Sequence, residues 1–170
     1  MSATTVEAVT HGHPLWDSLI QARDYERERV ERSLFVIKGK DLDFELTPQG
    51  YLKWYLHPAL DEPALRSMMF FEQMIPPGSS SGLMQHPGQL IHLILEGHGE
   101  FIMDGVSQEV WAADCVILPV TGRGVHYQFV NLERDEPLRF VAAMPNMFDA
   151  LGVDMGAGFE VIEFAPEYRA

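Results

Sequence analysis

The sequence predicts an all-β protein of the jelly-roll type, preceded by a helical arm. Short apolar stretches recur about every 8–12 residues, and turn residues such as Gly, Pro, Asn and Asp separate them. One stretch reads as hairpins: the alternating segment 90–95 enters a turn at 96–99, and a strand at 100–103 leads into the Asp104-Gly105 turn. Strands of this number and spacing are typical of a sandwich or barrel.

The N-terminal part is expected to form an arm over residues 1–34, before a barrel with a C-terminal tail over 35–170, in one domain. Trp16, Leu19 and Ile20 lie on one face of a helix that continues to about residue 31. Two interpretations of this helix remain open. It is a solvated helix with many i,i+4 charge pairs, or an arm that docks on another subunit.

The remaining pattern predicts a series of short strands. We expect them at 35–37, 43–46, 53–56, 67–76, 109–111, 115–118, 125–130 and 138–143. Cys115 lies in the apolar run CVIL, which predicts a buried small side chain. The segment 144–170 either wraps the barrel or contacts a neighbour.

Charge and composition exclude several classes of function. Twelve basic and 25 acidic residues give a net charge of −13, which argues against binding to nucleic acid or to an anionic membrane. A single cysteine excludes an internal disulfide and fits a reducing compartment. No signal peptide or apolar run of about 18 residues is evident, so we expect a cytoplasmic protein.

Residues 79–131 resemble the two motifs of the cupin superfamily. The first motif has the form G, five residues, HxH, three or four residues, E, six residues, G, and the second has G, five residues, PxG, two residues, H, three residues, N. The matching residues are His86, Pro87, Gly88, Glu96 and Gly97 in the first motif, and Asp114, Pro119, Gly122, His126 and Asn131 in the second. The resemblance implies a cupin jelly-roll barrel, with Glu96 in a turn and not at the metal site.

The same resemblance implies a metal site that has lost ligands. His86 and His126 take the second and last ligand positions, whereas Met84 replaces the first histidine and Leu90 replaces the carboxylate. A thioether is a poor ligand for Fe(II) or Mn(II), so two imidazoles alone would form a weak site.

His92 leaves one alternative open. It follows Leu90 by two residues, so on a strand it faces the same side. His86, His92 and His126 could then form a three-histidine site. Otherwise His92 is a satisfied histidine of the core.

The whole chain resembles the family of small (alpha) subunits of hydroquinone 1,2-dioxygenases. The segments that carry this resemblance are the helical arm, the strand SMMFFEQMIP, the hairpin LMQHPGQLIHLILEGHGEFIMDG and the tail AGFEVIEFAPEY. This resemblance implies an α2β2 assembly in which a larger cupin subunit holds Fe(II) and opens a small phenolic substrate, hydroquinone, to 4-hydroxymuconic semialdehyde. The small subunit would then carry neither the iron nor catalytic residues of its own.

Two other functions remain open from the sequence. The chain could be a self-sufficient metallo-cupin dioxygenase that binds iron through His86, His92 and His126. It could also be a metal-free cupin that binds a small molecule or acts as a sensor.

Overall fold

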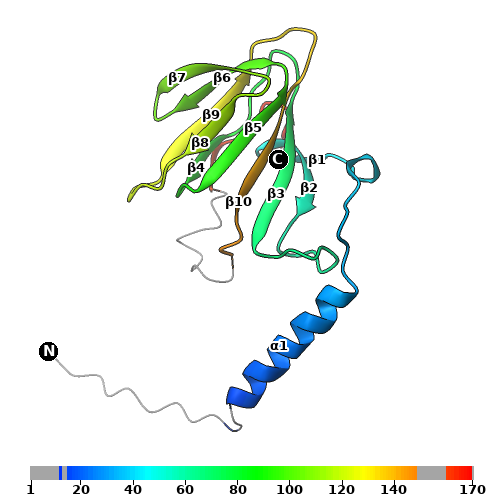
Figure 1. Ribbon diagram of the computed structural model, residues 1–170. Helices are drawn as coiled ribbons and strands as arrows, with labels where there is room; N and C mark the ends of the chain where they lie inside the picture. Colours follow the sequence, from blue (N-terminus) through cyan, green and yellow to red (C-terminus); the bar gives the residue numbers. More distant parts are fainter. Residues whose placement is uncertain (1–11, 13–14, 149–159, 170) are drawn as a thin grey trace, which may run out of the picture.

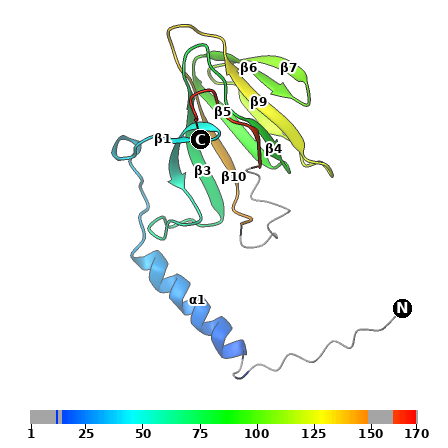
Figure 2. The same cartoon turned by 180° about the vertical axis from the view of Figure 1, so that it is seen from behind.

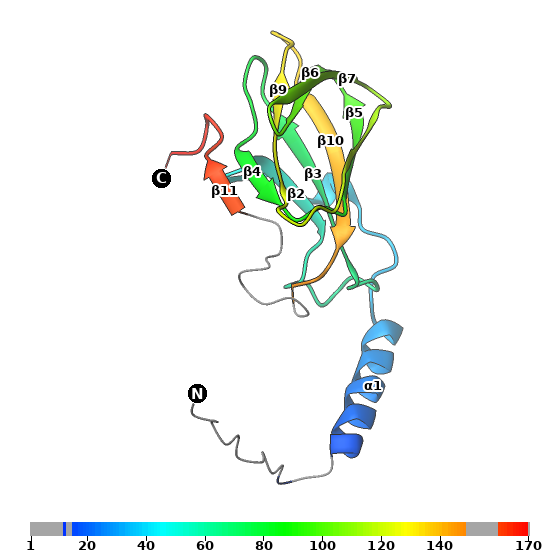
Figure 3. The same ribbon diagram turned by 90° about the vertical axis from the view of Figure 1, so that its left-hand side faces the viewer.

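Two antiparallel β-sheets pack face to face and form a jelly roll, as the sequence predicts (Figures 1 and 3). The computed structural model describes residue 12, residues 15–148 and residues 160–169. The six-stranded sheet has the order β1 (Glu45–Thr47), β2 (Gly50–Leu56), β3 (Met68–Ile75), β10 (Leu138–Pro145), β5 (Leu90–Glu96) and β8 (Cys115–Leu118). The five-stranded sheet has the order β11 (Glu160–Glu163), β4 (Leu83–His86), β9 (Val125–Asn131), β6 (His98–Met103) and β7 (Val106–Trp111).

The hairpin expected around the Asp104-Gly105 turn is confirmed. These two residues join β6 to β7, and both have positive φ angles, 50° and 80°. Positive φ at both central residues matches the right-handed twist of the flanking strands, and Asp-Gly adopts it readily. The turn therefore fixes the register of this pair, with Met103 opposite Val106.

The core lies between the two sheets and is filled by alternate residues of each strand. Along β9, buried residues alternate with more exposed ones from Val125 to Asn131, which is the period-two pattern of a strand with one buried face. Large apolar side chains dominate this space, and full burial of each contributes about 1.5–3 kcal/mol. The largest fully buried apolar side chains are Phe71, Phe129, Phe140, Leu52, Met69, Ile75, Met84, Leu90, Ile94, Leu118 and Leu138.

Three details differ from the sequence prediction. Residues 35–37 form no strand, and only a single bridge between Leu34 and Pro63 lies near them. The short strands β4 and β11 were not predicted, and their pairing shows that part of the C-terminal tail wraps the chain's own barrel. Cys115 is exposed, because it lies on the outward side of β8, where buried and exposed residues alternate.

Helix α1 (Leu15–Glu31) projects away from the two sheets in all views (Figures 1 and 2). Arg29, near its C-terminal end, is buried and attaches the helix to the loop before β3. Its Nη1 donates to the carbonyl oxygens of Pro63 at 2.8 Å and Asp61 at 3.2 Å. Within the described part of the chain, no helix is long and apolar enough to cross a membrane.

Replacement of Arg29 by Lys should loosen the arm without unfolding the barrel. An ammonium group cannot reproduce the planar fork that reaches several carbonyls, and hydrogen bonds from a charged donor contribute about 1.5–3 kcal/mol each. We expect amide hydrogen exchange in α1 to accelerate about tenfold or more, since 1.4 kcal/mol is one factor of ten. Arg27→Lys is the matched control, because Arg27 is exposed on the same helix. Equal exchange in both variants would show that Arg29 does not anchor the arm.

Candidate functional site

The residues at the ligand positions of the cupin motifs come from β4, β5 and β9. Strands β4 and β9 pair so that Met84 lies opposite Tyr127 and His86 opposite Val125. Directly opposed residues of an antiparallel pair point to the same face. Met84, His86 and Tyr127 all point into the barrel, where each is at most 4% exposed.

His126 does not join His86 and His92. It lies opposite Gln85, on the outer face of the same strand pair, and its side chain is 52% exposed. Its backbone N–H donates to Oδ1 of Asp104 at 2.9 Å. The three-histidine arrangement considered from the sequence is therefore not formed, because adjacent residues of a strand point to opposite faces.

Tyr127, and not His126, occupies the inward position of the last ligand. The second motif places three residues between its histidine and its asparagine, and exactly three residues separate Tyr127 from Asn131. Four residues separate His126 from Asn131. This spacing was present in the sequence and could have identified Tyr127. The last ligand position was instead assigned to His126, one residue earlier, because the motif has a histidine there. Burial raises the pKa of Tyr127, so its hydroxyl stays protonated.

His86 is held by the turn that follows β4. Its Nδ1 accepts a hydrogen bond from the backbone N–H of Gly88 at 3.0 Å. Gly88 has φ +108°, and a Cβ there would collide with the carbonyl of Pro119, so the turn requires glycine. Burial lowers the pKa of His86 to about 4, so the ring is neutral at pH 7.

A neutral imidazole carries one proton, and the contact with Gly88 determines where that proton lies. Because Nδ1 of His86 accepts, the proton is on Nε2. This Nε2 atom is buried and has no partner in the described structure. A buried donor without a partner lowers the stability of the folded protein by about 1–3 kcal/mol. The interior of the barrel therefore contains an unfavourable polar atom at this position.

His92 lies deeper, in a box of aromatic rings. Its ring centroid is 4.9 Å from that of Phe129, 5.3 Å from that of Phe140 and 5.6 Å from that of Tyr127. Burial, and the proximity of His86, lower the pKa of His92 to about 3. Its Nδ1 is also buried without a partner.

These residues do not fit an Fe(II) centre. The four inward motif positions hold Met84, His86, Leu90 and Tyr127, so there is no carboxylate among them. A metal-binding histidine normally donates its second ring N–H to a neighbour, whereas the second nitrogen of His86 accepts and its inward nitrogen carries the proton. Among the residues that the structure describes, no group of three or more His, Cys, Asp or Glu could hold a metal.

Other motif residues have structural roles. The buried side-chain amide of Asn131 donates to the carbonyl oxygens of Ile75, Pro76 and Glu136, which ties the end of β9 to two loops. Glu96 lies at the end of β5, where its carboxylate accepts a hydrogen bond from Arg139 at 2.8 Å. Glu96 was expected in a turn and not at the metal site. It is the last residue of β5 and forms a surface ion pair with Arg139, away from the interior histidines.

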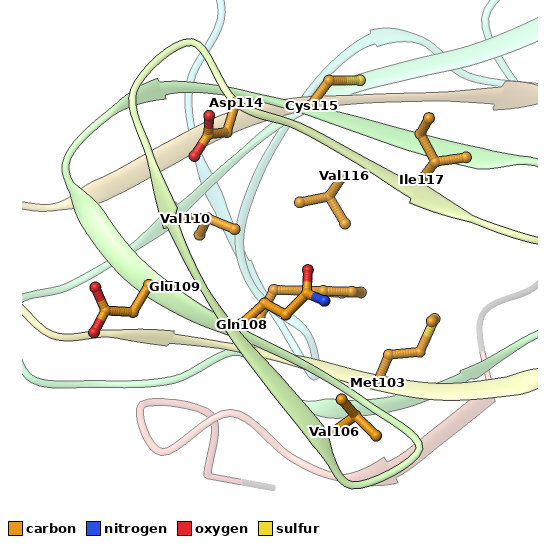
Figure 4. Close-up of a pocket in the computed structure, with 10 residues that line it drawn as sticks. Met103, Val106, Gln108, Glu109, Val110, Asp114, Cys115, Val116 and Ile117 are labelled. Carbon is orange, nitrogen blue, oxygen red and sulfur yellow. The ribbon is translucent and has the colours of Figure 1, made fainter.

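A cleft of about 290 Å³ lies elsewhere, at the open edges of the two sheets (Figure 4). Strands β7 and β8 end their respective sheets and flank this cleft. Apolar side chains such as Val106 and Ile117 line it together with Gln108, Asp114 and Cys115. Neither His86 nor His92 reaches it, so the interior histidines and the cleft are separate features.

Comparisons with known proteins agree with this architecture. Residues 71–144 match the Cupin_2 family of cupin domains. No curated protein sequence matches the chain significantly. Among solved structures, the polyketide cyclase RemF from Streptomyces resistomycificus is similar with a TM-score of 0.55 and 17% identity, over 66% of this chain and 79% of that one.

Two proteins from Thermotoga maritima have similar structures, with TM-scores near that of the cyclase. A predicted oxalate decarboxylase has a TM-score of 0.52 and 24% identity, over 65% of this chain and 98% of that one. A cupin-like protein has a TM-score of 0.50 and 18% identity, over 71% of this chain and 88% of that one. Identities this low establish the fold and not the activity. Residues 71–144 therefore match a cupin domain, and the described chain has a jelly-roll fold similar to that of these structures.

Proposed function

We propose that this chain is the small, iron-free subunit of an Fe(II)-dependent dioxygenase that converts hydroquinone to 4-hydroxymuconic semialdehyde. In this proposal a larger cupin subunit holds the iron in an α2β2 assembly. The observation that carries it is the inward set Met84, His86, Leu90 and Tyr127, which keeps the barrel packed but does not fit an iron centre. The substrate and the partner come from the resemblance of the whole chain to that family of subunits.

Exposed apolar side chains support the idea of a partner. Trp16 and Leu19 on α1 are 69% and 60% exposed, and Phe35 and Val36 after the helix are 77% and 72% exposed. Exposed apolar surface of this extent is typical of interaction sites, and aromatic side chains often dominate their binding energy. Phe164 in the tail is exposed as well, whereas Phe159 lies outside the described residues.

A second uncovered surface lies on the outer face of the six-stranded sheet. Ile91 and Leu93 on β5 and Ile117 on β8 all point outward and are exposed. Ile91 lies directly opposite Ile117, so these side chains form one continuous strip. Enzymes do occur among proteins of this fold, including the polyketide cyclase, but they do not by themselves assign an activity to this chain.

Metal content and oxygen uptake test the proposal directly. We expect the chain expressed alone to contain substoichiometric iron and to show no oxygen uptake with hydroquinone. Co-expression with the larger cupin subunit of such a dioxygenase should yield an iron-containing complex that consumes oxygen. One tightly bound iron and turnover by the chain alone would contradict the proposal and favour a self-sufficient metallo-cupin.

The arm is expected to contribute to assembly. Trp16→Ser removes the most exposed aromatic side chain of α1, so recovery of the larger subunit by affinity purification of this chain should fall. Val106→Ser is the matched control, because Val106 is 63% exposed but lies on β7, in the barrel. Equal recovery with the two variants would show that the arm is not part of the interface.

The interior histidines should make the fold sensitive to acid. Their pKa values are about 4 and 3 in the folded protein and near 6.5 in the unfolded chain, so unfolding takes up protons as the pH falls below about 6.5. Each histidine should lower the free energy of unfolding by up to about 1.4 kcal/mol per pH unit between pH 6.5 and its folded pKa. Urea unfolding from pH 7 to pH 4.5 measures this slope.

A variant isolates the contribution of the deeper histidine. His92→Leu should flatten the dependence on pH, whatever its effect on stability at pH 7. His126→Gln is the control variant, because the His126 side chain is half exposed on the outer face and lies outside the packed interior. Parallel curves for wild type and His92→Leu would show that His92 is not buried in its neutral form.

A further inference from the structure

Strand β7 leaves part of its core-facing side uncovered. Gln108 lies directly opposite the buried Phe101 of β6, so its side chain is on the side of the sheet that faces the core. Val106 and Val110 lie on the same side, two residues before and after it. Val106 and Gln108 are nevertheless exposed, whereas Val110 is buried. The cleft of about 290 Å³ is lined by all three side chains, so it opens where the core-facing side of β7 is not covered by protein (Figure 4).

The buried part of the lining is apolar. Phe101, Val110 and Val116 line the cleft and are 7%, 5% and 8% exposed. Phe101 also packs on Phe129 with a centroid distance of 4.9 Å, and Phe129 in turn packs on His92. The contacts from the cleft to His92 thus pass through two aromatic rings, and none of the four inward ligand positions of the motifs lines the cleft. A ligand here would occupy a site apart from the interior of the barrel.

Two polar side chains of the lining have capacity for further hydrogen bonds. The side-chain amide of Gln108 makes no hydrogen bond to another described residue. Asp114 accepts from the backbone N–H of Trp111 through Oδ2 at 2.8 Å, which leaves its Oδ1 available. Glu109 lines the cleft as well, but its carboxylate lies 3.5 Å from Nε2 of His98 on the outer face. Asp114 is therefore the carboxylate that a ligand can engage.

The charged side chains of the lining are all acidic. Asp114 and Glu109 supply two carboxylates, and no Lys, Arg or His is among the described residues that line the cleft. An anionic ligand would lie beside these carboxylates without a countercharge, whereas a cationic ligand would be attracted to them. The net charge of −13 attracts cations at longer range. Charge complementarity thus favours a cation.

We propose that this cleft binds a small organic cation that carries an ammonium group on an apolar body the size of one ring. The ammonium group donates to Oδ1 of Asp114, and the apolar body packs on Phe101, Val106 and Val116. A volume of about 290 Å³ lies at the lower end of the range of small-molecule sites and is sufficient for a single ring. This inference goes beyond the proposed function, because it concerns the chain's own surface and holds whether or not the chain assembles with a partner.

Phenethylamine is the probe, and phenethyl alcohol and hydrocinnamate are the neutral and anionic controls with the same ring. Methyl resonances of Val106, Val116 and Ile117 in the full chain at pH 7 report binding in the cleft. We expect phenethylamine to shift these resonances saturably, phenethyl alcohol to bind about tenfold or more weakly, and hydrocinnamate to cause no shift. Equal affinity for the amine and the alcohol, or no shift with the amine, would overturn the proposal.

A conservative variant tests the role of the carboxylate. Asp114→Asn removes the charge but keeps an oxygen that can accept from Trp111, so the turn retains its hydrogen bond. Its affinity for phenethylamine should fall about tenfold or more. Asp135→Asn is the matched control, because it makes the same change in net charge at an exposed residue outside the lining. Equal affinity in the two variants would overturn the proposed contact.

Cys115 supplies a readout on the wild-type protein that needs no variant. It is the single cysteine of the chain, it is exposed and it lines the cleft. Saturating phenethylamine should slow its modification by methyl methanethiosulfonate, a small neutral thiol reagent, as followed by mass spectrometry. An unchanged rate would contradict the proposal. Protection of Cys115 by the larger subunit alone, and not by the amine, would show that a partner protein occupies the cleft instead.

Discussion

The pairing of β4 with β9 decides what the interior of this barrel can do. It places Met84 opposite Tyr127 and His86 opposite Val125, so that all four side chains point inward. A shift of one residue in this register would turn His126 inward and Tyr127 outward. The chemistry of the site thus depends on the backbone pairing of these two strands.

Aromatic and aliphatic side chains fill the space around His92, and they keep both interior histidines neutral. A barrel of this kind remains stable without a metal because burial of apolar surface is its main source of stability. Nε2 of His86 and Nδ1 of His92 are buried atoms of this interior that have no hydrogen-bond partner among the described residues.

The surface of the molecule exposes apolar side chains on the arm and on the outer face of the six-stranded sheet, as the proposed role of a subunit would require. The arm leaves the barrel at Arg29 and exposes Trp16, and the outer face of β5 and β8 exposes a strip that includes Ile117. A chain with a net charge of −13 would repel its own copies, so the partner proposed above would contribute fewer negative charges to such an interface.

Local sequence signals determined most of the fold. Period-two alternation and the Asp104-Gly105 turn predicted the jelly roll, and the cupin motifs placed Met84, His86 and Leu90 at ligand positions but assigned the last one to His126 in place of Tyr127. The outward placement of His126 and Cys115 depended on strand register, which is a long-range property that a single segment does not encode. The four-residue strands β4 and β11 were missed for the same reason, since each is defined by its partner strand and not by its own length. The sequence by itself therefore determined the architecture and the loss of the carboxylate, and its motif spacing already pointed to Tyr127. Only the tertiary structure decided that Nδ1 of His92 is buried without a partner and that the C-terminal tail pairs with β4, because burial and pairing depend on which strands meet.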